Sequence, residues 1–230
     1  MKAGKTLFWV TFYSITMGLL EAAVVIYLRK LYYPHGFSFP LSSMPNDVSV
    51  VEIWREAGTI IMLLSVGILA GKNRAEKFAW FIFSFAVWDI FYYLFLLVFT
   101  GWPQSLFTWD ILFLIPVPWV GPVVTPIIIA LTMILFALTV VYYSAKGINV
   151  ALKVKETILL LVGSLIVIIS FTEDYFRQNG DILYKNIRNG GSLFSDLTNF
   201  VPDHFDWLRF LAGESILILA WVIYAKRIRQ

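Results

Sequence analysis

The chain has no cysteine and only two histidines among its 230 residues. The lack of cysteine excludes disulfide bonds, thiolate metal sites and cysteine nucleophiles. Two histidines cannot form the histidine clusters of desaturases, and a common tetrahedral zinc site is not expected without cysteine. The sequence also contains no His-Glu-x-x-His and no Gly-x-Ser-x-Gly motif, the signatures of zinc proteases and serine hydrolases. Polar chemistry in this chain therefore rests mainly on carboxylates.

Charge is scarce as well, at 14% of residues, while hydrophobic residues make up 59%. This balance lies outside the range of ordinary soluble domains. Six continuous apolar segments of about 17–23 residues are each long enough to cross a hydrocarbon core of about 30 Å as a helix; they are residues 6–28, 53–71, 78–99, 123–145, 157–173 and 208–225. We therefore predict an all-α integral membrane protein, a six-transmembrane-helix bundle that forms a single polytopic domain over residues 1–230.

The charges that flank these segments sort by sign. Eleven of the 18 basic residues, but only Glu76 and Glu156 of the 15 acids, lie at one set of segment ends; the basic residues are Lys2, Lys5, Lys72, Arg74, Lys77, Lys146, Lys153, Lys155, Lys226, Arg227 and Arg229. Because Lys and Arg favour cytoplasmic loops, we predict a plasma membrane of the bacterial inner-membrane type with both termini cytoplasmic. The positions of the basic residues are explained by membrane topology and by attraction to anionic lipids, so they do not indicate a nucleic-acid partner. The predicted outer loops are 34–51, 100–122 and 174–207.

The segment after the third span is irregular. Thr108 is suited to cap a short helix, but the apolar run 111–115 is too short to cross a membrane. Pro116 and Pro118 then interrupt regular structure. We predict a half-helix near 108–118 that is either re-entrant or lies flat at the membrane interface, since irregular backbone at depth must be buried in protein or line a wet cavity.

Three carboxylates fall inside the predicted spans: Glu21, Asp89 and Glu214. Each lies roughly 10–15 Å below the outer end of its helix. No basic residue lies deep in a span to balance them, although Arg29, Arg55 and Arg209 lie near outer helix ends. Burying one such charge costs about 2.5–3.5 kcal/mol on insertion scales. We predict that at least two of the three converge on a functional site; the alternative is that each is a neutral acid hydrogen-bonded to a neighbouring helix.

Other polar residues accompany these acids near the outer ends. Glu52 and Glu56 share a helix face at i, i+4 spacing, but Ser49 to Glu52 also fits a capping box, which would make Glu52 structural. Asp89 is followed at i+3 and i+4 by Tyr92 and Tyr93, whose phenols can hydrogen-bond a carboxylate or a polar head group.

These considerations give a set of predicted roles. The predicted catalytic residues are Glu56, Asp89 and Glu214; the predicted substrate-binding residues are Glu21, Arg55, Tyr92, Tyr93, Asp110, Arg177 and Arg209; the predicted metal ligands are Glu173, Asp174 and His204. Oxygen ligands favour a hard divalent cation, which would be Mg²⁺, Mn²⁺ or Ca²⁺. The arginines are suited to neutralise a phosphate.

Three functions are compatible with this pattern. The first is a membrane-embedded enzyme that performs metal-assisted hydrolysis or group transfer on a lipid or polyprenyl-phosphate-like substrate. The second is a non-catalytic subunit whose acids are matched by other membrane subunits. The third is a proton- or cation-coupled transporter, because intramembrane acids and broken helices are the parts of such carriers. The lack of an inverted repeat and the apolar inner half of the spans argue against the third.

Overall fold

The computed structural model describes residues 3–115, 117–189 and 198–229. In this part of the chain it contains six helices and one two-stranded hairpin: α1 (Ala3–Tyr32), α2 (Asn46–Ala70), α3 (Arg74–Thr100), β1 (Trp109–Phe113), β2 (Trp119–Pro122), α4 (Val124–Ala145), α5 (Val154–Asn189) and α6 (Trp207–Arg229). All six helices are long and apolar enough to span a membrane, in α5 over Val154–Gly180. The predicted bundle of six apolar helices is confirmed.

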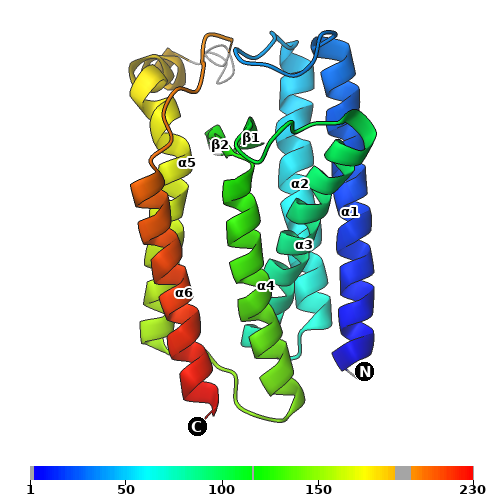
Figure 1. Cartoon of the computed structure of the whole chain (residues 1–230), viewed down its shortest axis with the longest axis vertical. Coiled ribbons are helices and arrows are strands. Elements are labelled where there is room, and N and C mark those ends of the chain that lie inside the picture. The colour runs from blue at the N-terminus through cyan, green and yellow to red at the C-terminus, as the bar shows by residue number, and fades with distance from the viewer. Residues whose placement is uncertain (1–2, 116, 190–197, 230) are drawn as a thin grey trace.

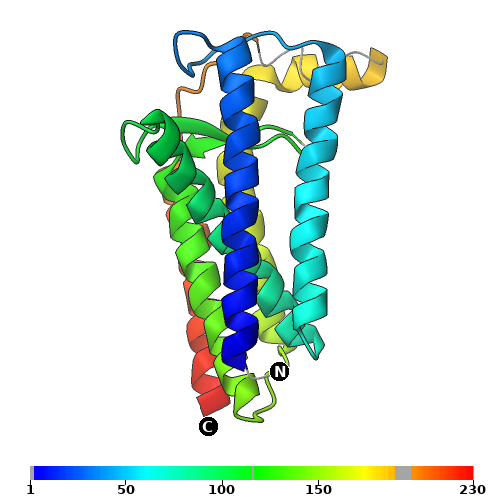
Figure 2. The ribbon, with the colours of Figure 1, turned by 90° about the vertical axis from the view of Figure 1, so that its right-hand side faces the viewer.

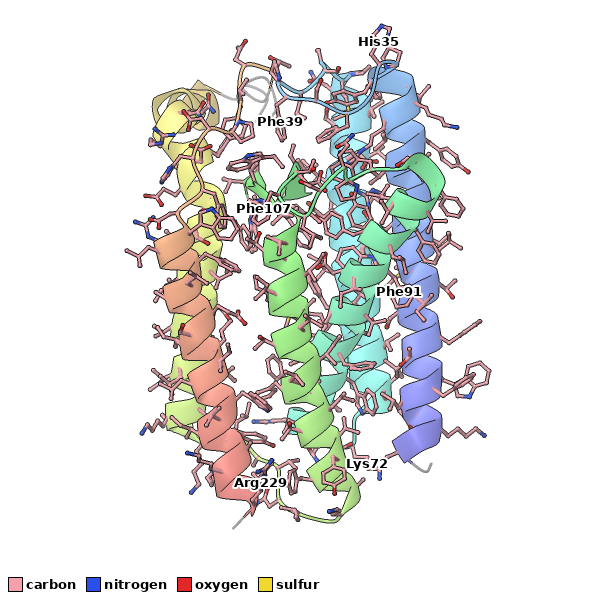
Figure 3. The ribbon with its side chains drawn as sticks, in the orientation of Figure 1. His35, Phe39, Lys72, Phe91, Phe107 and Arg229 are labelled. Atoms are coloured by element: carbon pink, nitrogen blue, oxygen red, sulfur yellow. The ribbon has the colours of Figure 1, made fainter. Side chains whose placement is uncertain are left out.

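The helices run alternately up and down, so the bundle has two distinct ends (Figure 1). The terminal end holds the start of α1 and the end of α6, and Lys72 and Arg229 lie there in Figure 3. The loop end holds residues 33–45 and 198–206, and His35 lies there in Figure 3. In Figure 2 the last turns of α5 run across this loop end. The charge asymmetry of the sequence thus corresponds to the two ends of one bundle.

Helix α3 is the centre of the packing. Helices α1, α2 and α4 pack along it, whereas α1 and α2 hardly touch each other. Gly18 allows the backbone of α1 to lie directly against α3, because a methyl group there would be 2.9 Å from the carbonyl oxygen of Trp88. Helices α5 and α6 form a separate pair, which meets the rest of the molecule mainly where α6 contacts α4 and α5 contacts β2.

Large apolar side chains cover the outside of the bundle. Leu69, Leu208 and Trp54 are 85%, 82% and 73% exposed, respectively. A water-soluble protein rarely exposes so much contiguous apolar surface, whereas lipid tails solvate it. The outward faces of these helices are therefore suited to a bilayer.

The segment predicted as a half-helix is instead an antiparallel β-hairpin. β1 pairs with β2 so that Asp110 lies opposite Gly121, with an irregularity between Ile111 and Phe113. The helix prediction was wrong because the apolar run between Thr108 and the prolines is too short to offset helix nucleation, while its β-branched and aromatic residues favour strands. The hairpin lies among the helices, below the loops of the loop end (Figures 1 and 2).

The predicted outer loops are also shorter than expected. Helix α2 begins at Asn46, inside the predicted loop 34–51, and α5 continues to Asn189, inside the predicted loop 174–207. Residues 190–197 of that loop lie outside the described residues. The part of the loop end that the structure describes is closed by aromatic packing, in which Phe39 and Tyr175 both contact Phe200.

Candidate functional site

A cavity of about 140 Å³ lies between α1, α2, α3 and β1, toward the loop end. We call it the carboxylate cavity, because its charged lining comprises five acids and two arginines: Glu21, Arg29, Glu52, Arg55, Glu56, Asp89 and Asp110. Tyr92 and Tyr93 line it as well. It forms where α1 and α2 both pack on α3 with little contact between themselves. Five of the residues predicted to bind substrate and two predicted to be catalytic therefore share this one space.

Arg55 on α2 balances two of the acids. Its guanidinium pairs with Glu21 of α1 and, through Nε, with Oε2 of Glu52 at 2.8 Å. The hydroxyl of Thr59 donates to Glu21 Oε2 at 3.3 Å. Glu21, which the sequence predicts to lie within a span, is thus reached by a basic residue, one of the ways in which such a charge is accommodated in a membrane.

The capping-box interpretation of Glu52 was wrong. Helix α2 begins three residues before Ser49, so Ser49 is already helical and its hydroxyl donates to the carbonyl oxygen of Pro45 at 3.2 Å. The side chain of Glu52 is therefore free to pair with Arg55. Glu52 belongs to the wall of the cavity.

Asp110 on β1 joins the hairpin to α1 and α3. Its Oδ1 lies 3.0 Å from Arg29 Nη2, and its Oδ2 accepts a hydrogen bond from the Tyr93 hydroxyl at 3.2 Å. The Arg29 guanidinium also lies 3.8 Å from the centre of the Trp102 ring and 4.2 Å from that of Phe37. Asp110 is only 1% exposed. This burial raises the pKa of its carboxyl group to about 6, although Arg29, the Ile111 backbone and Tyr93 each lower it.

Glu56 fastens the segment after β1 to α2. Both of its carboxylate oxygens accept from the backbone N–H of Leu114, at 2.8 and 3.1 Å. Since β1 also carries Asp110, two acids predicted from the sequence attach the hairpin to the helices that line the cavity. Glu56 therefore has a structural role, which is separate from its predicted catalytic role.

Asp89 differs from the other acids of the cavity. Within the described residues its carboxyl group has no hydrogen bond and no ion pair, and the charge that acts on it most is that of Asp110. It lies on α3, next to the close contact between Trp88 and Gly18. An unpaired carboxyl group that faces a cavity is free to interact with a ligand or to exchange a proton.

Glu214 lies elsewhere. It is buried on α6 and accepts a hydrogen bond from the Thr132 hydroxyl of α4, while its Oε2 has no partner among the described residues. It does not line the carboxylate cavity. The structure therefore brings together Glu21 and Asp89 of the three predicted intramembrane acids and leaves Glu214 apart.

The remaining predicted site residues form ion pairs at the loop ends of α5 and α6. Arg209 pairs with Glu173 and lies 3.5 Å from Asp206, and Arg177 pairs with Asp203 and, at 2.7 Å, with Asp174. These two arginines are not among the residues that line the carboxylate cavity.

The predicted metal ligands lie in one region, because Oδ2 of Asp174 accepts a hydrogen bond from the backbone N–H of Asp203 at 3.1 Å, next to His204. Glu173 and Asp174 are occupied by arginines, and His204 is exposed. Over residues 3–115, 117–189 and 198–229, no group of three or more His, Asp or Glu side chains is arranged to hold a metal ion. Among the described residues, the ligands proposed for a hard divalent cation are therefore not arranged as a metal site.

The predicted set of site residues omits Arg29, which the sequence offers as a partner of the acids, and Glu52, which it leaves open between a helix cap and the site. The position of Arg29 in the last turn of α1 was a usable signal, but its partner Asp110 is 81 residues away. Comparisons of the chain with protein-family models, with curated proteins and with solved structures find no match. The chemistry of the site is therefore argued from its own residues.

Proposed function

We propose that the chain is a membrane-embedded enzyme that performs hydrolysis or group transfer on the head group of a lipid or polyprenyl-phosphate-like substrate. The observation that carries this proposal is Asp89, an acid within a span that has no partner among the described residues and faces a cavity. Pockets for drug-sized ligands measure about 300–1,000 Å³. A cavity of about 140 Å³ is suited to a small head group whose lipid chains stay in the bilayer.

The cavity residues divide into three roles in this proposal. Asp89 is the general base or acid, because a carboxyl group without an ion-pair partner can accept and return a proton. Arg29 is the candidate anion-binding group, because its Nη1 has no partner among the described residues while its Nη2 pairs with Asp110. Arg55 would contact a phosphate only by exchanging its pairing with Glu21 or Glu52. Tyr92 and Tyr93 line the same space, and their phenols are suited to orient polar groups of the substrate. The divalent cation remains a separate prediction, which elemental analysis of the purified protein tests.

The orientation in the membrane is also a proposal. The positive-inside rule places the terminal end in the cytoplasm of a bacterial-type cell and the carboxylate cavity toward the outer leaflet. The chain has no cysteine, so a single introduced cysteine is the only thiol that can be labelled. Ser38→Cys places it at the loop end and Lys226→Cys at the terminal end, and their labelling shows which end faces outward. In intact cells a membrane-impermeant maleimide should label only the Ser38→Cys variant. Labelling of the Lys226→Cys variant alone would reverse the orientation.

Proteoliposomes test the enzymatic proposal. The full chain is reconstituted with a short-chain polyprenyl diphosphate or with phosphatidylglycerol, and released phosphate and lipid products are followed by mass spectrometry. Loss of a general acid–base group typically lowers rates by about 10²–10⁴-fold, so Asp89→Asn should lose at least about 100-fold. Asp47→Asn, in the exposed first turn of α2, is the matched control and should keep its activity. Equal turnover by the wild type and Asp89→Asn would refute the role of Asp89.

A proton-coupled carrier is the second candidate. It is favoured by Glu214, whose unpartnered oxygen adds a second buried acid between a different pair of helices. Acids in series within a bundle are typical of proton relays. Proteoliposomes loaded with a pH-sensitive dye should then show proton flux that Glu214→Gln and Asp89→Asn each abolish. No flux in the wild type would remove this candidate.

A further inference from the structure

A second cavity, of about 300 Å³, lies at the terminal end of the bundle. It is bounded by the first turn of α1, the loop between α2 and α3, the start of α3 and the end of α4. We call it the terminal-end cavity; its polar lining residues are Thr6, Lys72, Glu76, Trp80 and Ser144. It lies at the opposite end of the bundle from the carboxylate cavity, and Figure 3 shows Lys72 at this end. The proposed function makes no use of it.

Three hydrogen-bond donors of this cavity are unused. The Lys72 ammonium, the Thr6 hydroxyl and the Trp80 indole N–H have no hydrogen bond and no ion pair within the part of the chain that the structure describes. Thr6 and Trp80 are nevertheless buried, at 8% and 3% exposure. Their hydrogen-bonding atoms are, however, not fully enclosed by protein, so they are open to a ligand in the cavity. A ligand that offers only acceptors, with negative charge beside the ammonium, would satisfy all three.

Glu76 is the one acid in the wall, and its carboxylate oxygens are already hydrogen-bonded. Its carboxylate accepts from the Lys72 backbone N–H at 2.9 Å, from Asn73 Nδ2 at 3.3 Å and from the Ser144 hydroxyl. It also lies in the first turn of α3, where the helix dipole stabilises negative charge. Glu76 therefore uses its oxygens within the wall of the cavity, whereas the Lys72 ammonium forms no ion pair within the described residues and remains available to an anion.

The surroundings of the cavity favour an anion that carries lipid chains. Lys5, Arg74 and Lys77 lie at the same end of the bundle, and such basic groups attract anionic lipids. The rest of the wall includes Ala3, Ala70 and Val141. An opening at the helix ends with small apolar walls allows a head group to enter while its glycerol and acyl chains stay against the apolar surface of the bundle.

We infer that the terminal-end cavity binds a phosphate group, held by Lys72, Thr6 and Trp80. The source is either the head group of an anionic phospholipid or a free phosphate anion, since both present the same acceptor oxygens. The site binds and does not react, so its test is binding alone and is independent of whether the carboxylate cavity is catalytic.

Native mass spectrometry of the delipidated full chain in a mild detergent tests this inference. The protein is titrated with phosphatidylglycerol, with diacylglycerol, which lacks phosphate, and separately with inorganic phosphate as a competitor. The variants are Lys72→Gln, which removes the charge, Thr6→Val, which removes the hydroxyl at similar volume, and Lys72→Arg, which keeps the charge. Lys146→Gln is the matched control, because Lys146 lies at the same end but rests 4.2 Å from the Tyr142 ring and does not line the cavity.

The wild type and Lys72→Arg should bind one phosphatidylglycerol in preference to diacylglycerol. Lys72→Gln should weaken that binding by about tenfold and Thr6→Val by about threefold, whereas Lys146→Gln should stay within twofold of the wild type. Displacement of phosphatidylglycerol by millimolar inorganic phosphate would support the site with free phosphate as an occupant, and no displacement would support it with the lipid head group. Equal losses in Lys72→Gln and Lys146→Gln, or wild-type binding by Lys72→Gln, would overturn the inference.

Discussion

Two carboxylates at the terminal end of the bundle and Asp89 in the carboxylate cavity stand in opposite circumstances. At the terminal end, Glu156 accepts from the Lys153 backbone N–H at 2.8 Å and from Arg227 Nε and Nη2 at 2.6 and 2.8 Å. Glu76 is held in a similar way by three donors. In the carboxylate cavity, Asp89 has no partner among the described residues.

The difference follows from where each acid stands in its helix. Glu76 and Glu156 occupy the first turns of α3 and α5, where backbone N–H groups are free and the helix dipole favours negative charge. Asp89 lies in the middle of α3, where every nearby backbone N–H is used by the helix. An acid in the first turn of a helix therefore stabilises the fold. An unpaired acid in the middle of a helix lowers the stability of the fold, so its presence calls for a functional explanation.

The largest expected contrast in stability is between Glu156→Gln and Asp89→Asn. Glu156 is 2% exposed, and its replacement removes two charge-assisted bonds to Arg227, which should lower the free energy of unfolding by about 2–3 kcal/mol. Asp89→Asn should leave it unchanged or raise it by about 1 kcal/mol, since an unpaired, half-buried acid is removed. Denaturation in mixed detergent micelles measures both, with the exposed neighbour change Lys155→Gln as control. A loss for Asp89→Asn equal to that for Glu156→Gln would remove the distinction between the two ends.

The hairpin that carries Asp110 gives the next largest effect. A methyl group at Gly121, which pairs with Asp110 across the hairpin, would lie 3.0 Å from two ring carbons of Phe171 and 3.2 Å from Phe205. Gly121→Ala should therefore lower the free energy of unfolding by about 1–2 kcal/mol, a typical cost of overpacking. Gly58→Ala is the control, because nothing lies within 4 Å of that methyl group. Helix propensity should make it stabilising by up to about 1 kcal/mol, and a loss in that variant would show that packing is not the cause.

The pH dependence of stability sharpens the comparison at Asp110. Because burial raises its pKa to about 6, the stability it contributes is complete below about pH 4 and is lost as the pH rises through about 6. The free energy of unfolding of the wild type relative to Asp110→Asn should therefore fall from pH 4 to pH 7.5, by at most about 1.4 kcal/mol per pH unit. Arg29, Tyr93 and Asp89 act on the same group. A rise over this range would mean that the ion pair with Arg29 outweighs burial.

The smallest expected effect concerns the acid outside both cavities. Thr132→Val removes the hydroxyl that donates to Glu214 and should lower the free energy of unfolding by about 0.6 kcal/mol, an average value for such bonds between membrane helices. Thr139→Val is a matched control on the same helix, since its hydroxyl also bonds an α6 side chain, the indole of Trp221, at 3.0 Å. Similar losses of unfolding free energy in both variants would identify the Glu214 contact as ordinary helix packing. A loss above about 2 kcal/mol for Thr132→Val alone would show that Glu214 resembles the acids of the terminal end.

The helices were predictable because each depends on a long apolar run that only a helix can place in a membrane. The hairpin was not predictable, because residues 109–113 are compatible with several short structures. Their pairing with residues 119–122 decides which of these structures forms. For the cavity, depth in a span was enough to single out Glu21 and Asp89, but their meeting depends on the contact between α1 and α3 at Gly18. The place of Glu214 depends on the rotation of α6 about its axis, which no local pattern specifies.

Every residue that lines the carboxylate cavity falls between Glu21 and Leu114. During synthesis a chain emerges from its N-terminus, so these residues are all made before α4 begins. The second half of the chain adds β2 behind β1 and the α5–α6 pair beside it. The segments that form the walls of the cavity are thus synthesised first. The segments that pack behind them, β2 and the α5–α6 pair, are synthesised afterwards.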